Sequence, residues 1–240
     1  MLVKTEAIVL NRIRYTDNSF VVNLYSEEYG RVSALVRTSS KKPETKANIF
    51  APLNIIRTEL KVKDTRTVQN ISYHELVKSP TAHSNDISRI CISQFIAEVI
   101  LKMVREEERN ESLYNFFVST INAIENTDNN IVNVHIIFLK DFASHIGFGI
   151  TNNYCVETPY FNTREGMFLP VYTTDEESFD MPLSVAFSRL LAMSYDTNDS
   201  KFPYSYRKKM IDVMLSYYKM HSENISEIKS LKVMNDIFSE

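Results

Sequence analysis

The chain has 240 residues, of which 44% are hydrophobic and 24% charged, and its formal net charge is −3 at pH 7. This balance is typical of a folded globular protein with one large or two ordinary domains, and it argues against extended disorder. The apolar runs are far shorter than the roughly 20 residues that a membrane-spanning helix needs, and the N-terminal segment lacks a signal-peptide pattern. We expect a cytoplasmic protein with no membrane partner.

The charge is distributed unevenly along the chain. Residues 1–80 contain 13 Lys and Arg against 8 Asp and Glu, whereas residues 81–240 contain 14 against 22. A basic N-terminal part and an acidic C-terminal part indicate two units with different partners. We place the boundary between these two predicted domains at Pro80, where the character of the sequence changes.

Residues 1–80 carry the short alternating patterns that are typical of β-strands. Strands are predicted at 6–14, 19–26, 31–37, 53–62 and 66–73. Five short strands in one small domain predict a closed or partly open barrel, and a barrel of this size matches the OB-fold. OB-folds bind single strands of nucleic acid through a cationic groove and stacking aromatic side chains.

A basic segment begins in the third predicted strand and continues into the loop after it. Its cations are Arg31 and Arg37 in the strand and Lys41, Lys42 and Lys46 in the loop. Such a cluster at the end of a strand is a candidate edge for binding phosphates, to which neighbouring strands could add Arg14 and Arg57. The alternative is an ordinary solvated lysine-rich loop.

Four aromatic residues of the predicted barrel are candidates for stacking on nucleic-acid bases. They are Tyr15, Tyr25, Tyr29 and Phe50. Because aromatic side chains in small barrels more often belong to the core, the sequence leaves a packing role open for each of them.

Residues 81–240 are predicted to be mainly helical. Ser84, Asn85 and Asp86 are suited to cap a helix that runs to about residue 105 and is apolar on most sides. Further helices are predicted at 112–125, 131–146, 183–195, 203–221 and 228–238. Residues 148–182 contain Gly and Pro without a long helical period, which predicts an irregular insert or a small hairpin. The predicted fold class is α+β, with an N-terminal OB-fold barrel followed by a helical C-terminal domain.

The sequence contains no recognisable catalytic constellation. Cys91 and Cys155 are its only cysteines, and its five histidines lack the spacing of metal sites. The glycine-rich nucleotide motifs and the GxSxG motif are also absent. We expect no cofactor, no metal ion and no enzymatic activity.

A second basic spot lies in the acidic half of the chain. It consists of Arg207, Lys208 and Lys209, near the start of the helix predicted at 203–221. A solvated helix face is the default interpretation, and a docking point for an acidic peptide tail is the alternative.

Several segments resemble the RecO family of bacterial recombination mediators. They are residues 7–10, 15–17 and 21–25, the turn into Gly30 and Arg31 with its basic loop, and residues 207–221 and 229–234. The resemblance implies an N-terminal OB-fold, a helical C-terminal domain and binding of single-stranded and double-stranded DNA. It also implies annealing of complementary strands and help in loading RecA onto strands coated with single-stranded-DNA-binding protein. The implied protein partners are RecR and the acidic C-terminal tail of the single-strand-binding protein, and the implied location is the bacterial nucleoid.

The chain departs from that family at one place. Many members carry a four-cysteine zinc module between the later helices, whereas residues 154–168 of this chain contain the single cysteine Cys155. We expect an insert without zinc, held together by the packing of Tyr154, Tyr160, Phe161 and Phe168.

Two other functions stay open at this stage. A protein-interaction adaptor would use the barrel to bind another protein, with the basic loop serving only solubility. An enzyme of unrecognised type is the other, although no nucleophile, base or metal site supports it.

Overall fold

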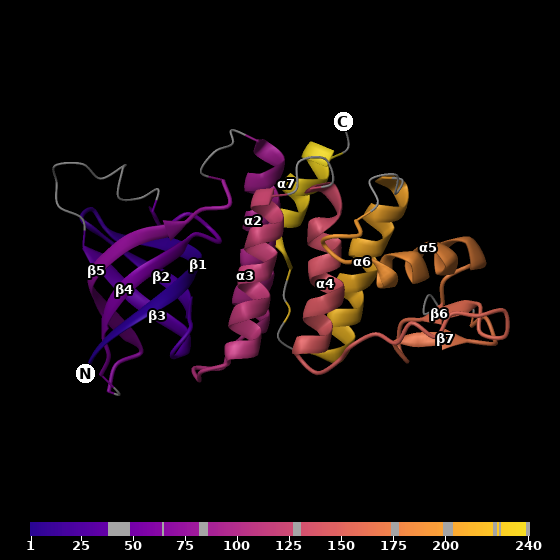
Figure 1. Ribbon diagram of the computed structural model, residues 1–240, viewed down its shortest axis with the longest axis horizontal. Coiled ribbons are helices and arrows are strands. Elements are labelled where there is room, and N and C mark those ends of the chain that lie inside the picture. Colours follow the sequence, from indigo (N-terminus) through magenta and orange to yellow (C-terminus); the bar gives the residue numbers. More distant parts are fainter. Residues whose placement is uncertain are drawn as a thin grey trace. The chain divides into compact units, whose positions relative to one another are not determined.

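The computed structural model of the chain describes residues 1–37, 49–63, 65–81, 86–126, 131–173, 178–198, 204–222, 225 and 227–238. The chain forms two compact units, Met1–Asn126 with Ile228–Leu231 and Thr127–Glu227 with Lys232–Glu240. The first contains a β-barrel and two helices, and the second contains most of the remaining elements (Figure 1). The domain boundary at residue 80 stays a prediction.

Five strands form the barrel. They are β1 (Leu2–Thr16), β2 (Ser19–Ser26), β3 (Gly30–Arg37), β4 (Ile55–Lys61) and β5 (Val68–Lys78). Around the closed barrel they follow the order β1-β2-β3-β5-β4, in which β3 and β5 pair in parallel and the other neighbours pair in antiparallel fashion. This topology confirms the predicted OB-fold and α+β class. β1 is longer than predicted because its first half pairs with β4 and its second half with β2.

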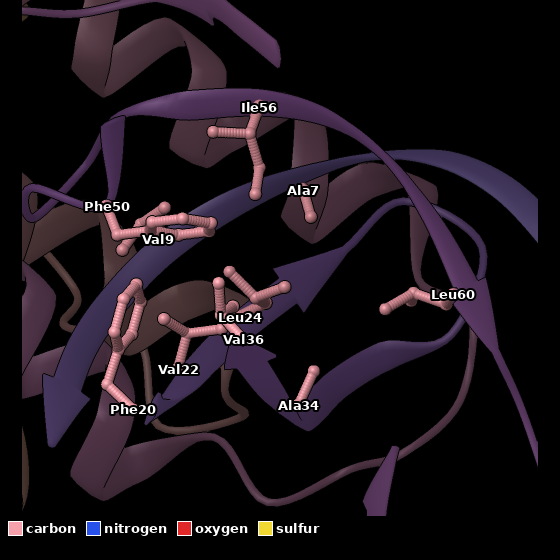
Figure 2. Packing of buried hydrophobic residues seen from close by; sticks show 10 residues of the cluster. All are labelled: Ala7, Val9, Phe20, Val22, Leu24, Ala34, Val36, Phe50, Ile56 and Leu60. Atoms are coloured by element: carbon pink, nitrogen blue, oxygen red, sulfur yellow. The ribbon is translucent and has the colours of Figure 1, made fainter. Parts of the chain in front are cut away.

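The barrel is filled by the apolar side chains that alternate along its strands. The buried core residues are Ala7, Val9, Phe20, Val22, Leu24, Ala34, Val36, Phe50, Ile56 and Leu60. Figure 2 shows Phe20 and Phe50 next to each other, where their rings meet edge to face with centroids 5.2 Å apart. Because the side-chain period of a strand is two, this inward set also determines which residues face outward.

Two helices complete the first unit and cover part of the outer surface of the barrel. α2 (Ile87–Met103) packs against β1 and α3 (Glu111–Asn126). The carboxylate of Asp86 accepts a hydrogen bond from the Ser88 amide at 2.9 Å, which confirms Asp86 as the N-cap of α2. Tyr25 faces outward from β2, yet it is buried because its ring packs edge to face against Phe117 of α3.

The turn between β2 and β3 lies directly against the segment that follows α2. Gly30 has a φ of +61°, and a Cβ atom there would stand 2.4 Å from the carbonyl oxygen of Glu108 and 2.7 Å from that of Glu106. The next amide, that of Arg31, donates to the Glu106 carbonyl oxygen at 3.0 Å. Glycine is therefore required here both by the backbone conformation and by the space available.

The chain returns to the first unit near its C-terminus, at the start of α7 (Lys229–Phe238). The carboxylate of Glu98 on α2 accepts hydrogen bonds from the amides of Lys229 and Ser230 at 3.0 and 2.9 Å, and from the Ser230 hydroxyl at 2.6 Å. Burial raises the pKa of Glu98, but these hydrogen bonds outweigh it and hold the pKa below its ordinary value. The carboxylate thus satisfies the free amides at the start of a helix.

The second unit is built from α4 (Val134–His145), α5 (Met181–Ala192), α6 (Tyr204–His221) and most of α7, with a short 3₁₀ turn at Ile131–Asn133. These elements confirm the helices predicted for this part of the chain. α4 contacts both α5 and α6, and the hydroxyl of Tyr218 donates to the Leu139 carbonyl oxygen at 2.6 Å in the interior. Gly147, with a φ of +94°, ends α4 as predicted.

The insert between α4 and α5 contains a small hairpin, β6 (Tyr160–Asn162) and β7 (Met167–Leu169). Phe161 lies at its centre, in ring contact with Phe168, Phe179 and Phe187. Tyr154 packs edge to face on Phe168, so the four predicted aromatic residues all make ring contacts within the unit that contains the insert. The fourth, Tyr160, contacts Tyr172.

We predict that Gly30→Ala lowers the free energy of unfolding by about 2–3 kcal/mol, because a positive φ alone costs an alanine about 1–2 kcal/mol and the new Cβ also meets two carbonyl oxygens. Gly147→Ala is the matched control, since Gly147 has a positive φ but no atom within 4 Å of the position that an alanine Cβ would take. Urea denaturation measures both values. Equal losses for the two variants would show that the close approach at Gly30 has no energetic consequence.

Candidate nucleic-acid interface

One end of the barrel brings together cations from two strands. At this end β1 turns into β2 and β3 terminates, and the register pairs Thr16 with Ser19 and Ser19 with Arg37. Arg14 lies two residues before Thr16 and opposite Phe20 of β2. We call this end the rim and define it by Arg12, Arg14, Tyr15 and Arg37. Of the predicted site residues, Arg14 and Arg37 lie at this end of the barrel. Arg14 pairs with the core residue Phe20, whereas Arg37 follows the core residue Val36, so the register directs their side chains to opposite faces of the sheet.

Both arginines of this pair are accessible to a ligand. Arg14 donates to the Asp17 carboxylate at 2.7 Å, but the two side chains are 77% and 93% exposed. An ion pair in such a solvated position contributes little, so a phosphate can replace the carboxylate. Arg37 is exposed, and its side chain makes no hydrogen bond or ion pair with the described part of the chain.

Tyr15 follows Arg14 in β1 and is 69% exposed. The pairing of β1 with β2 shifts between Arg14 and Thr16, which leaves Tyr15 out of the ladder. Such a bulge redirects a side chain, and an exposed ring beside arginines suits stacking on an unpaired base. The stacking prediction is wrong for Tyr25 and Phe50, because α3 covers the first and the barrel core encloses the second. Tyr29 is half-buried.

Arg31 has a structural position at the other end of β3. Its Nη1 donates to the carbonyl oxygen of Val104 at 2.9 Å, and Val104 is the C-cap of α2. A guanidinium at the carboxyl end of a helix satisfies a free carbonyl group and meets the negative end of the helix dipole. Arg31 therefore attaches the barrel to α2 and lies away from the rim.

Arg57 lies in a row of acidic side chains on the outer surface of β1, β4 and β5. Its guanidinium donates to Glu6 at 2.9 Å and to Glu75 at 2.8 Å, and these two hydrogen bonds raise its pKa. Lys4 pairs with Glu59 at 3.4 Å on the same surface. Because both of its hydrogen-bond partners are carboxylates, Arg57 is less available to a phosphate than Arg14 or Arg37.

Lys41, Lys42 and Lys46 lie outside the described residues, and their role in binding stays a prediction. The segment that contains them follows Arg37, the last residue of β3. Arg37 is thus the last described residue before the basic loop, and it belongs to the rim.

The prediction omitted a second exposed cation group, at the turn between β4 and β5. The Gln69 side chain organises this turn by accepting from the Lys63 amide at 2.9 Å and donating to the Arg66 carbonyl oxygen at 2.7 Å. Lys61, Lys63 and Arg66 are all exposed around it. Strand direction places this turn at the end of the barrel opposite the rim, because β4 runs away from the rim. The charge pattern of the sequence does not distinguish these residues from Arg37, whereas the strand topology places them at the other end of the barrel.

The second basic spot lies on the first turns of α6. Lys208 and Lys209 are exposed, whereas Arg207 is half-buried. The positive charge of Arg207 interacts electrostatically with His135 of α4. The His135 side chain is 2% exposed and stacks on the ring of Phe238. Burial, followed by the charge of Arg207, lowers the pKa of His135 to about 3. Lys208 and Lys209 thus remain available for a partner, while Arg207 also belongs to the interior of its unit.

Comparison with known proteins decides the family. Residues 1–80 match the family model described as recombination protein O N terminal, and residues 84–232 match the model described as recombination protein O C terminal. The chain belongs to the RecO family of DNA repair proteins. A DNA repair protein RecO of Azobacteroides pseudotrichonymphae is 33% identical over 248 residues, which cover 99% of this chain and 100% of that relative. Proteins of the same name from Flavobacterium psychrophilum and Flavobacterium johnsoniae are each 28% identical over the full length of both chains.

The residues of the insert do not fit the zinc module of many RecO proteins. Cys155 is exposed, and its Sγ lies 3.1 Å from the hydroxyl of Thr158. Across the described ranges, no three His, Cys, Asp or Glu side chains are grouped closely enough to hold a metal ion. The donor set for a four-cysteine site is incomplete, and ring contacts around Phe161 pack the insert. That the protein binds no zinc stays a prediction.

The helices of the described segments include none that is long and apolar enough to cross a membrane.

We predict that stability falls as the pH drops below about 6.5 because of His135. Its pKa is about 6.5 in the unfolded chain and about 3 in the folded one, so over this window the unfolded state binds a proton that the native state excludes. The free energy of unfolding should therefore decrease by up to about 1.4 kcal/mol per pH unit between pH 6.5 and 5.

Urea denaturation of His135→Leu should remove this part of the pH dependence, whereas His145→Gln, at an exposed position of the same helix, should keep it. If wild type and His135→Leu lost stability in parallel between pH 6.5 and 5, His135 would not be the group responsible.

Proposed function

We propose that this protein binds single-stranded and double-stranded DNA, anneals complementary strands and assists the loading of RecA onto single strands coated with single-stranded-DNA-binding protein. The observation that carries the proposal is the rim, where the exposed residues Arg14, Tyr15 and Arg37 lie at one end of an OB-fold barrel. Membership of the RecO family supports it, since the relatives are named as DNA repair proteins.

The chemistry of the rim is that of a phosphate-binding surface. Arginine forms paired, charge-assisted hydrogen bonds with phosphate oxygens, and each neutralised phosphate releases counterions into the solution. The basic loop with Lys41, Lys42 and Lys46 would extend this surface. Binding through ion exchange is reversible and tolerates any sequence, which are the properties that strand annealing requires.

The second unit supplies the partner functions in this proposal. Lys208 and Lys209 are exposed at the start of α6 and would dock the acidic C-terminal tail of the single-strand-binding protein. RecR would be a further protein partner. The protein would act without breaking a covalent bond, in the bacterial cytoplasm at the nucleoid.

The salt dependence of DNA binding tests the role of the rim. If about four phosphates are contacted, the slope of log affinity against log salt for single strands should be near −3. Replacing Arg14 and Arg37 together by Ala should make this slope less negative by about 1.4, because two phosphate contacts are lost. Fluorescence anisotropy with a labelled oligonucleotide measures the slope.

The matched control is the double replacement of Lys61 and Lys63 by Ala, which removes two exposed cations from the opposite end of the barrel. This control should retain the wild-type slope. If only the control variant changed the salt slope, the DNA site would lie at the β4–β5 turn and not at the rim. If the wild-type protein bound no oligonucleotide, an adaptor that recognises protein would be favoured.

A further inference from the structure

A cavity of about 560 Å³ lies between the barrel and α2, within the first unit. Its walls come from three segments: residues 49–54 before β4, residues 76–81 at the end of β5 and after it, and residues 90–94 of α2. None of the rim residues lines it, so the cavity is separate from the rim. Its volume falls within the range of about 300–1,000 Å³ that is typical of small-molecule sites.

The lining of the cavity is mainly apolar and, within the described residues, carries no charge. Leu76 and Ile90 are 45% and 46% exposed, and they form its mouth. The cations that adjoin lining residues in the sequence are engaged elsewhere, because Lys78 pairs with Glu125 at 2.6 Å and Arg89 donates to the carbonyl oxygen of the same residue at 2.8 Å. A charged ligand would therefore meet no counter-ion among the lining side chains, and its burial would be costly.

The buried part of the cavity contains a hydroxyl group that the fold does not use. Ser93 of α2 is 2% exposed, and its Oγ has no hydrogen-bond partner among the residues that the structure describes. Buried hydroxyl groups in native proteins nearly always have a partner, because an unpaired one destabilises the folded state. A ligand with a carbonyl or N–H group beside Ser93 would supply that partner.

The wall formed by residues 49–54 has a strained backbone that is held in place from β1. Leu53 has a φ of +62°, which is uncommon for a residue with a side chain. Its amide donates to the Val9 carbonyl oxygen at 2.8 Å, and the Val9 amide donates to the Asn54 carbonyl oxygen at 2.8 Å. Asn54 Nδ2 also donates to the Ile49 carbonyl oxygen at 3.0 Å. Strained segments of this kind cluster at ligand sites, and these hydrogen bonds give the cavity a preformed wall.

We propose that the cavity binds a small, uncharged and largely apolar molecule whose one polar group forms a hydrogen bond with the Ser93 hydroxyl. The apolar lining contacts the body of the molecule, and the lack of a counter-ion in the lining excludes ions. Because the walls belong to the barrel and to α2, the bound molecule also stabilises the folded first unit. This site goes beyond the proposed function, since it involves neither DNA nor the rim.

Two probes of equal size and different charge test the site. Indole-3-carboxamide is uncharged, and indole-3-carboxylate is an anion. In titrations followed by two-dimensional amide NMR, we expect a dissociation constant of about 2 mM or lower for the carboxamide. The shifted signals should belong to residues 49–54, 76–81 and 90–94. The carboxylate should bind at least about tenfold more weakly, because its burial leaves a charge unpaired.

Ser93→Ala should weaken binding of the carboxamide about fivefold, because it removes the hydrogen bond and leaves the apolar lining in place. Alanine favours the helix, so this variant should fold. Ser88→Ala, on the first turn of the same helix and outside the cavity, is the matched control and should bind the carboxamide like the wild type. Ala51→Leu provides a second variant, which adds volume at a lining position and should abolish binding.

The inference would be overturned by equal affinity for the two probes, by no binding of the carboxamide to the wild type, or by unchanged affinity in Ser93→Ala. Signal shifts confined to other parts of the chain would also overturn it. None of these results depends on the salt slope of DNA binding, so failure of the cavity as a ligand site would leave the proposed function standing.

Discussion

Closure of the barrel through the parallel pair of β3 and β5 is the constraint on which the rest of the structure depends. Closure fixes the register of all five strands, and the register decides which side chains fill the core and which face outward. α2 and α3 then cover one part of the outer surface, held by Arg31, Gly30 and the ring of Tyr25. The uncovered part, with its rim of arginines, is the surface that remains for a ligand.

Closure of the barrel also gives different surroundings to cations that look equivalent in the sequence. Arg31 and Arg37 belong to one strand and face the same way, yet one binds the end of α2 and the other stays exposed at the rim. Arg57 is placed by its register between two carboxylates. In the proposed function, the rim would attract phosphates and the acidic side chains around Arg57 would disfavour them, which would give a bound strand a definite location.

The strands, the helices and the OB-fold were predictable because they depend on local alternation, helical period and capping residues such as Asp86. The site was only partly predictable. Nothing near Arg57 in the sequence indicates Glu6 or Glu75, which come from two other strands, and the burial of Tyr25 depends on Phe117 in a later helix. Likewise, nothing in the sequence separates the cations of the β4–β5 turn from Arg37, but the strand directions place them at the opposite end of the barrel.

Hydrogen–deuterium exchange of the protein with and without a single-stranded oligonucleotide tests the central claim most directly, because it locates the strand on the barrel without any substitution. The account predicts slower exchange in peptides that cover residues 11–23 and 33–37, with no change in those that cover residues 57–67. Protection of residues 57–67, with residues 11–23 and 33–37 unchanged, would contradict it.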